Sequence, residues 1–140
     1  MSVELLNQDT VVEYLISKKV IKNEDNPQVE VLTGGVSNVV LAITTATQKL
    51  VLKQALAELA VSEKWVADQR RAIVEAEAIE LFNRLTPTQV PKLVFLDPER
   101  FILVLERVPV GSTVWKSDLL AGVINPDIGL KLGATLASWH

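Results

Sequence analysis

The 140-residue sequence contains no cysteine and only one histidine, His140. The absence of thiols excludes disulfides and cysteine-based metal sites, although it says little about the compartment. No run of about 18 apolar residues occurs, so no membrane-spanning segment is expected. Positions 1–15 lack a basic start and an apolar core and do not resemble a signal peptide. These absences favour a cytoplasmic protein.

An excess of one charge is also absent. The sequence has 14 basic and 17 acidic residues and a formal net charge of −3. No broad electrostatic attraction to nucleic acid is therefore expected. In contrast, 49% of the residues are hydrophobic and the mean hydropathy is +0.27. For a chain of one domain's length, this indicates apolar surface that something else covers.

The stretch at positions 29–56, VEVLTGGVSNVVLAITTATQKLVLKQAL, predicts three strands. Valines alternate with other residues at 29–32, as in a half-buried strand. β-branched and apolar runs follow at 39–43 and 50–52, and a polar turn at 44–48 separates them.

Gly34 and Gly35 lie between the first two of these strands, and Lys53 closes the third. Glycines allow backbone angles that a side chain forbids, and the N–H groups of such a turn form a concavity for anions. Strand alternation places Lys53 on the face of Val51, where an ammonium group needs an anionic partner such as a phosphate. The alternative is that the glycines only form a turn and Lys53 extends to water.

Residues 69–85 form the most regular predicted helix. On a 3.6-residue period, one face carries Arg71, Glu75, Ala78, Ile79, Phe82 and Leu85. Glu75 is the unexpected charge in this stripe, because buried carboxylates are normally paired. Its candidate partners are Arg71, one turn earlier, and Lys53 from the sheet. The alternative is an exposed Arg71–Glu75 pair at helical spacing.

Two further strands, 92–96 and 101–106, are expected on either side of a tight turn at 97–100. A first helix begins at Thr10, which has capping-box spacing with Glu13. Short turns between successive strands imply antiparallel pairing. The predicted fold class is therefore α+β, a five-stranded antiparallel sheet with one long helix across it.

The remaining segments are assigned from weaker signals. Residues 57–68 form a loop or a short helix, 107–112 have the composition of a linker, and 115–123 start a short helix. A last helix is expected at 126–139, with Asn125 as its N-cap. The apolar stripe of this helix consists of Ile128, Leu132, Leu136 and Trp139. No residue after His140 is available to pack against this stripe.

Several segments, in this order and spacing, resemble the amino-terminal part of the aminoglycoside phosphotransferase and methylthioribose kinase family, which has the protein-kinase-like fold: TGGVSN (33–38), LVLKQAL (50–56), Trp65, RAIVEAEAI (71–79), VPKLVFLD (90–97), VLERVP (104–109), WKSDLLAG (115–122) and GATLASWH (133–140). KQAL followed by a tryptophan and an R-x-x-x-E helix is more similar to methylthioribose kinases than to antibiotic-resistance enzymes. The resemblance covers nearly the whole chain but does not specify a substrate.

The resemblance implies an ATP site formed by Gly34, Gly35, Ser37, Asn38, Val51, Lys53, Glu75, Glu106 and Val108. The first four would form the loop over the phosphates. Lys53 would contact the α- and β-phosphates and would be oriented by Glu75. Backbone groups at positions 106–108 would bond the adenine edge, and Val36 and Val51 would line its pocket.

The same resemblance implies a nucleotide-binding lobe at 1–106, a hinge at 107–112 and the start of a second lobe at 113–140. In this family the catalytic aspartate lies in a later H-G-D-x-x-x-x-N-like loop, and the Mg²⁺ ligands lie there and in a following acidic motif. These 140 residues contain neither motif, and His140 matches the end of a helix instead. The chain is therefore expected to hold ATP, to contain no catalytic or metal-ligating residue, and to be inactive alone.

Three functions remain open at this stage. The first is the ATP-binding lobe of a kinase that phosphorylates a hydroxyl of a sugar or an aminoglycoside-like substrate. The second is a non-catalytic module, from a truncated or degenerate relative, that binds a nucleotide or a partner. The third is an unrelated α+β domain, in which Lys53 and Glu75 would not converge. The underside of the sheet and the last helix are expected to be exposed and to cause self-association.

Overall fold

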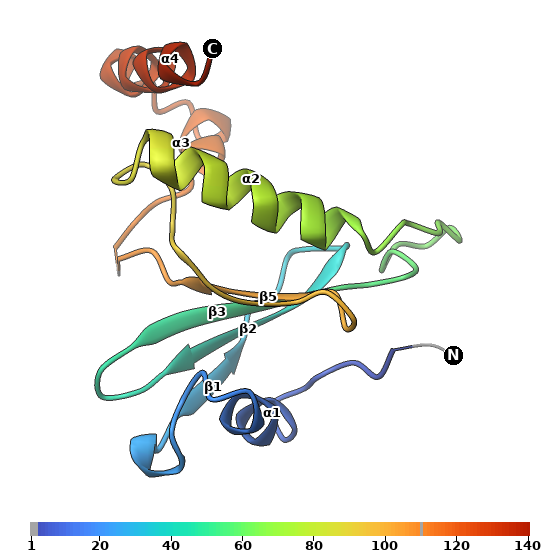
Figure 1. Ribbon diagram of the computed structural model, residues 1–140. Helices are drawn as coiled ribbons and strands as arrows, with labels where there is room; N and C mark the ends of the chain where they lie inside the picture. The colour runs from blue at the N-terminus through green and yellow to red at the C-terminus, as the bar shows by residue number, and fades with distance from the viewer. Residues whose placement is uncertain (1–2, 110) are drawn as a thin grey trace.

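The computed structural model describes residues 3–109 and 111–140. Helix α1 (Val11–Ser17) lies against one face of a five-stranded sheet, and helix α2 (Arg71–Leu85) crosses the other face (Figure 1). Helix α4 (Pro126–Trp139) lies beyond α2, away from the sheet. This arrangement confirms the predicted α+β class.

The sheet is antiparallel throughout, as expected from its short turns. Its order is β1-β2-β3-β5-β4. The strands are β1 (Gln28–Val31), β2 (Asn38–Thr44), β3 (Lys49–Ala55), β4 (Leu93–Asp97) and β5 (Ile102–Glu106). Strand β3 continues two residues beyond Lys53, where the sequence pattern ends it, because Gln54 pairs with Ile102 of β5. Local alternation carries no information on this long-range pairing.

The face that α1 covers holds the main hydrophobic core. Its buried side chains are Leu6, Val11, Tyr14, Leu15, Ile21, Leu41, Ile43, Leu50, Leu52, Ile102 and Val104. On the opposite face Leu103 and Leu105 are buried, whereas Val40 and Val51 are half-buried. This second face therefore retains part of the open apolar surface that the composition predicts.

Helix α1 begins without the capping box expected from Thr10 and Glu13. Thr10 occupies the N-cap position, but its side chain makes no capping hydrogen bond. Instead, Oδ1 of Asn7 accepts hydrogen bonds from the N–H groups of Asp9 and Thr10, at 2.9 and 3.0 Å. This local turn uses an asparagine side chain upstream of the predicted cap.

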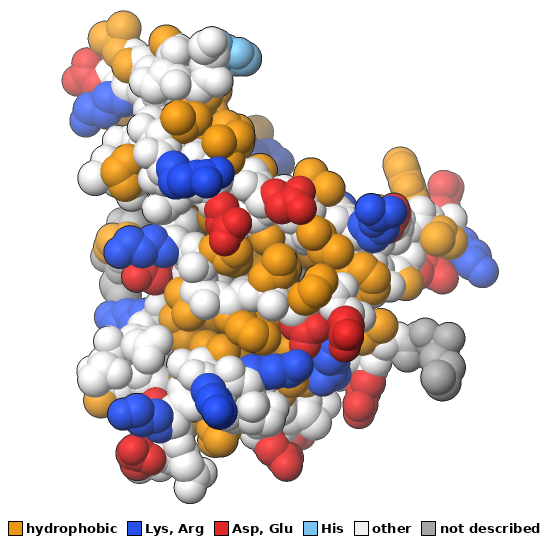
Figure 2. Space-filling model, viewed as in Figure 1, with side chains coloured by type: hydrophobic (Ala, Val, Ile, Leu, Met, Phe, Trp, Pro, Cys, Tyr) orange, Lys and Arg blue, Asp and Glu red, His pale blue; other side chains and the backbone are white. Residues whose placement is uncertain are grey.

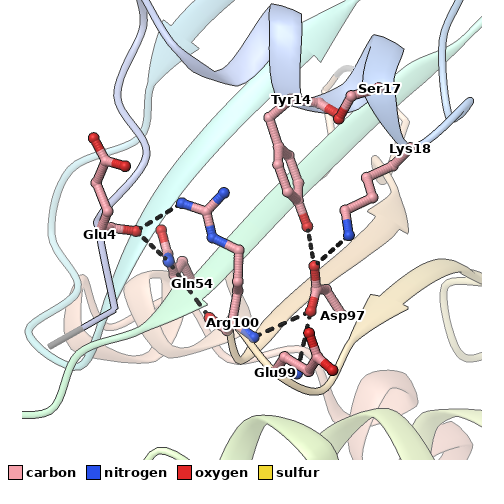
Figure 3. A network of polar contacts seen from close by, with 8 residues as sticks. All are labelled: Glu4, Tyr14, Ser17, Lys18, Gln54, Asp97, Glu99 and Arg100. Atoms are coloured by element: carbon pink, nitrogen blue, oxygen red, sulfur yellow. Dashed lines mark hydrogen bonds and ion pairs between the residues drawn. The ribbon is translucent and has the colours of Figure 1, made fainter. Parts of the chain in front are cut away.

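A polar network fastens α1 to the turn between β4 and β5 (Figure 3). The Tyr14 hydroxyl donates to Oδ2 of Asp97 at 2.8 Å, and Nζ of Lys18 lies 3.0 Å from the same oxygen. The other carboxylate oxygen of Asp97 accepts from the N–H groups of Glu99 and Arg100, both at 3.1 Å. A single carboxylate thus joins the helix to the turn.

Burial and hydrogen bonding both shift pKa values in this network. Burial, and then the hydrogen bond and charge of Asp97, raise the pKa of Tyr14 above its usual value. Burial alone would also raise the pKa of Asp97, but hydrogen bonds from Tyr14 and Lys18 outweigh it and lower that pKa. Nearby, Oε1 of the buried Gln54 accepts from the N–H of Leu6 at 2.8 Å, which holds the N-terminal segment on the sheet.

Helix α2 packs through a face that differs from the predicted one. Ala72 and Ala76 are buried, and Ile79 packs against the cluster that contains Leu103. Leu85, which belongs to the predicted stripe, is 48% exposed. The small alanine side chains let the helix approach the sheet closely, so the largest apolar residues do not mark the buried face.

The C-terminal part begins with the segment 107–112, of which residue 110 lies outside the described residues. Helix α3 (Trp115–Leu120) ends three residues before the predicted limit of 123. Helix α4 has the expected cap, because Oδ1 of Asn125 accepts from the N–H of Asp127 at 3.1 Å. Across the described ranges, no helix has the length and apolar character needed to cross a membrane.

The end of α4 packs against α2, contrary to the expectation that its stripe has no partner. The rings of Trp139 and Phe82 stack with centroids 4.0 Å apart and planes 18° from parallel. Nε1 of Trp139 also donates to Oγ1 of Thr86 at 2.9 Å. Leu132 and Leu136, further back on the same stripe, are each 42% exposed, so most of the predicted open surface remains.

Candidate functional site

Lys53 and Glu75 meet on the face of the sheet that α2 crosses. Lys53 extends from the central strand β3, and its Nζ forms an ion pair with Oε1 of Glu75 in α2. The two side chains are 23% and 37% exposed, so solvent reaches the pair. Of the two partners considered for Glu75, Lys53 is therefore the one that it contacts. The alternative prediction, an Arg71–Glu75 pair, is wrong.

Arg71 instead binds backbone carbonyls around the start of α2. Its Nη1 donates to the carbonyl of Asp68 at 2.8 Å, and its Nη2 donates to those of Ser37 and Leu56 at 2.5 and 2.8 Å. The intervening residues 57–68 form a loop, in which the only bridge between described residues joins Glu58 and Val66. Arg71 thus connects α2 with the ends of two strands.

The glycine turn between β1 and β2 is open. Gly34 has φ of +100°, a conformation that favours glycine, and a Cβ added at either Gly34 or Gly35 would meet no atom within 4 Å. The turn then leads into β2, where Nδ2 of Asn38 donates to Oγ of Ser37 at 3.0 Å. The chain therefore leaves free space around both glycines.

An apolar strip crosses the sheet beside Lys53. Val51 lies two residues before Lys53 on the same face and pairs with Ala42 of β2 and Leu105 of β5. Val36, next to the glycine turn, is 45% exposed.

The chain leaves β5 at Glu106 and passes the outer end of the strip. The N–H of Glu106 donates to the carbonyl of Lys92 at 3.0 Å, and the N–H of Arg107 donates to that of Lys49 at 2.8 Å. Nη2 of Arg107 lies 3.4 Å from Oε2 of Glu30 on β1. Val108 follows and is 57% exposed.

The structure thus brings Lys53 to Glu75 and places Val51 on their side of the sheet. Sequence reasoning missed the carbonyl contacts of Arg71 and the Arg107–Glu30 pair. For Arg71 the signal was its position one turn before Glu75, but that spacing also fits a simple surface pair. Residues 3–109 and 111–140 contain no group of three or more histidines, aspartates or glutamates that could hold a metal ion.

A five-stranded antiparallel sheet crossed by a helix, with a lysine and a glutamate paired between them, is the arrangement of a kinase-like amino-terminal lobe. No protein-family model matches the chain. It is similar to the methylthioribose kinase of Pectobacterium carotovorum subsp. carotovorum, with 31% identity over 94 residues that cover 66% of this chain and 23% of the relative.

Two other relatives align over more of the chain. The methylthioribose kinase of Enterobacter sp. (strain 638) is 29% identical over 120 residues, which are 81% of this chain and 30% of the relative. That of Bacillus thuringiensis subsp. konkukian is 25% identical over 134 residues, which are 95% and 34%. The chain thus spans about a third or less of the length of these relatives, and it is similar to methylthioribose kinases over most of its own length.

Proposed function

We propose that this chain is the ATP-binding part of a small-molecule phosphotransferase that phosphorylates a hydroxyl of a sugar. The observation that carries the proposal is the Lys53–Glu75 ion pair on the open side of the sheet. Kinases use such a pair to hold a lysine against the nucleotide phosphates. The names of the relatives support methylthioribose as the acceptor.

In this proposal each element of the site has one task. Glu75 holds the Lys53 ammonium in place, and Lys53 then neutralises charge on the α- and β-phosphates. N–H groups of the turn at Gly34 and Gly35 bind the phosphates from the other side, next to Ser37 and Asn38.

The adenine ring rests on the apolar strip at Val51. Its edge bonds the carbonyl of Glu106 and the N–H of Val108, because the N–H groups of Glu106 and Arg107 already serve the sheet. Residues 107–112 act as the hinge to a second lobe that begins at 113–140.

ATP enters with Mg²⁺, which neutralises the phosphates. None of the residues assigned above holds the metal, and none acts as a base on the acceptor hydroxyl. The proposal therefore assigns the metal ligands and the catalytic aspartate to polypeptide outside these 140 residues, together with most of the acceptor site. It also places the protein in the cytoplasm and predicts that this chain alone does not transfer phosphate.

Calorimetric titration of ATP into the chain tests the proposal. Saturable binding is expected for the wild type, with loss of most affinity in Lys53→Ala because the phosphates lose their cation. Lys49→Ala is the matched control, since it removes a lysine from the same face of the same strand. Equal affinities of the wild type and Lys53→Ala would refute the assigned phosphate site. Absence of binding to the wild type would refute a nucleotide site on this chain.

Exposed apolar side chains on the C-terminal helices support an additional proposal, that the isolated chain self-associates. Leu120 and Leu130 are 79% and 73% exposed, and Ile124 between the helices is 78% exposed. Figure 2 shows hydrophobic side chains at the surface of this part of the molecule and also between α2 and the sheet. Burial of such surface against a second copy lowers its contact with water.

A further inference from the structure

Arg71 occupies a junction of three chain segments. It is the first residue of α2, one turn before Glu75, and its guanidinium donates to carbonyls of Asp68, Ser37 and Leu56. These carbonyls belong to the segment before α2, the end of the glycine turn and the segment after β3. A guanidinium is planar and fixes several acceptors at once, which an ammonium group does not.

Ser37 is the acceptor that links this junction to the glycine turn. Its carbonyl also accepts from the N–H of Leu56 at 3.0 Å, and the carbonyl of Val36 accepts from the N–H of Ala60 at 2.8 Å. The turn is therefore attached at its β2 end to residues 56–60, and Arg71 fixes the same carbonyl from the helix. Gln69 adds a bond from Nε2 to the carbonyl of Ala55 at 2.7 Å.

Two ionic side chains one turn apart on α2 therefore contact the two parts of the phosphate site. Glu75 contacts Lys53, and Arg71 contacts the carbonyl two residues after Gly35. The three acceptors of Arg71 are all backbone oxygens, so the geometry of the guanidinium matters more than charge neutralisation. A shift of α2 would move both parts together.

We propose that Arg71 is a positioning residue that fixes the glycine turn relative to α2, so that the turn and Lys53 bind the same phosphates. This inference rests on the proposed nucleotide site and adds to it the coupling between its two halves. It predicts that removal of the guanidinium loosens the turn and lowers affinity for phosphate-bearing ligands, but not for adenosine.

Two measurements on the 140-residue chain separate the effect of Arg71 on the glycine turn from its effect on phosphate binding. Amide hydrogen exchange without ligand reports on the turn itself, and calorimetric titration with ADP and with adenosine reports on phosphate binding. The variants are Arg71→Ala, Arg71→Lys and the control Arg70→Ala, which removes an exposed neighbouring arginine. Arg71→Lys keeps the charge without the planar fork and is a second variant if Arg71→Ala does not fold.

Faster exchange of the Leu56 amide and of residues 35–38 is expected in both Arg71 variants, together with a loss of ADP affinity on the order of tenfold. Adenosine affinity and the Arg70→Ala protein should be unchanged. Unchanged exchange in Arg71→Ala, or full ADP affinity in Arg71→Lys, would overturn the proposal.

If the wild type binds neither ligand, the nucleotide function fails and so does the phosphate role of Arg71. In that case faster exchange in the Arg71 variants would still show the physical link between the turn and α2.

Discussion

Replacement of Tyr14 by phenylalanine tests how the N-terminal helix is held. The hydroxyl donates to Asp97, which is 5% exposed, so the variant removes one partner from a buried carboxylate and leaves the ring in place. Hydrogen bonds to charged groups contribute about 1.5–3 kcal/mol. Lys18 and two backbone N–H groups still bind Asp97, so the low end of that range applies. We expect a loss of about 1.5 kcal/mol in the free energy of unfolding.

The pH dependence of this loss follows from the two pKa shifts. The folded-state pKa of Asp97 is lowered, so its stabilisation is present above the ordinary aspartate pKa and is lost as the pH falls through the folded value. The pKa of Tyr14 is raised, so its stabilisation is present below the ordinary tyrosine pKa of about 10 and is lost above it. The difference between wild type and Tyr14→Phe should therefore be largest between about pH 5 and pH 9.

Urea denaturation across that pH range measures the effect. Ser17→Ala is a suitable control, because it removes a hydroxyl from the same helix that donates to the Tyr14 carbonyl and does not touch Asp97. The reasoning would be refuted by equal unfolding free energies of wild type and Tyr14→Phe at pH 7. A difference that persists unchanged at pH 2 would refute the assignment to the Asp97 carboxylate.

Three further predictions concern the glycine turn, the last helix and assembly. Gly34→Ala should destabilise the fold by about 1 kcal/mol in thermal unfolding, because φ is +100°, whereas Gly35→Ala should be nearly neutral; equal effects would contradict this. Trp139→Ala should speed hydrogen exchange in α4 through loss of the stack on Phe82, and unchanged exchange would show that this stack does not hold the helix. Sedimentation should show association at high micromolar concentration, and Leu120→Lys should reduce it; a wild-type monomer would contradict the expectation.

The fold was predictable where local pattern decides it. Alternation marks β1, apolar and β-branched runs mark β2 and β3, and helix periodicity marks α2. The cap at Asn125 was also predictable, because asparagine before Pro126 is a local signal.

Other features depend on contacts that are distant in sequence. The pairing of Gln54 with Ile102 lengthens β3, and the approach of Ala72 and Ala76 to the sheet sets the buried face of α2. At the start of α1 the expected capping bond of Thr10 does not form, and the side chain of Asn7 makes a local turn instead. A sequence pattern does not rank such competing contacts.

In the candidate site, too, some features follow from local sequence patterns and others from contacts between distant segments. Strand alternation placed Lys53 on the face of Val51, and the helix pattern identified Glu75 as an unexpected charge. The choice between Arg71 and Lys53 as the partner of Glu75 required the crossing of α2 over β3. The three carbonyl acceptors of Arg71 were not predictable, because they come from segments that meet only in the folded chain.

The most direct test of the central claim is the ratio of ADP affinity to adenosine affinity, measured side by side for the wild type and Lys53→Met. Only ADP carries phosphates, so the ratio separates the contribution of the phosphates from that of adenine on the apolar strip at Val51. The account predicts tighter binding of ADP than of adenosine by the wild type and a ratio near one in Lys53→Met, with adenosine binding preserved. A ratio that Lys53→Met leaves unchanged would contradict the assignment of the phosphates to Lys53.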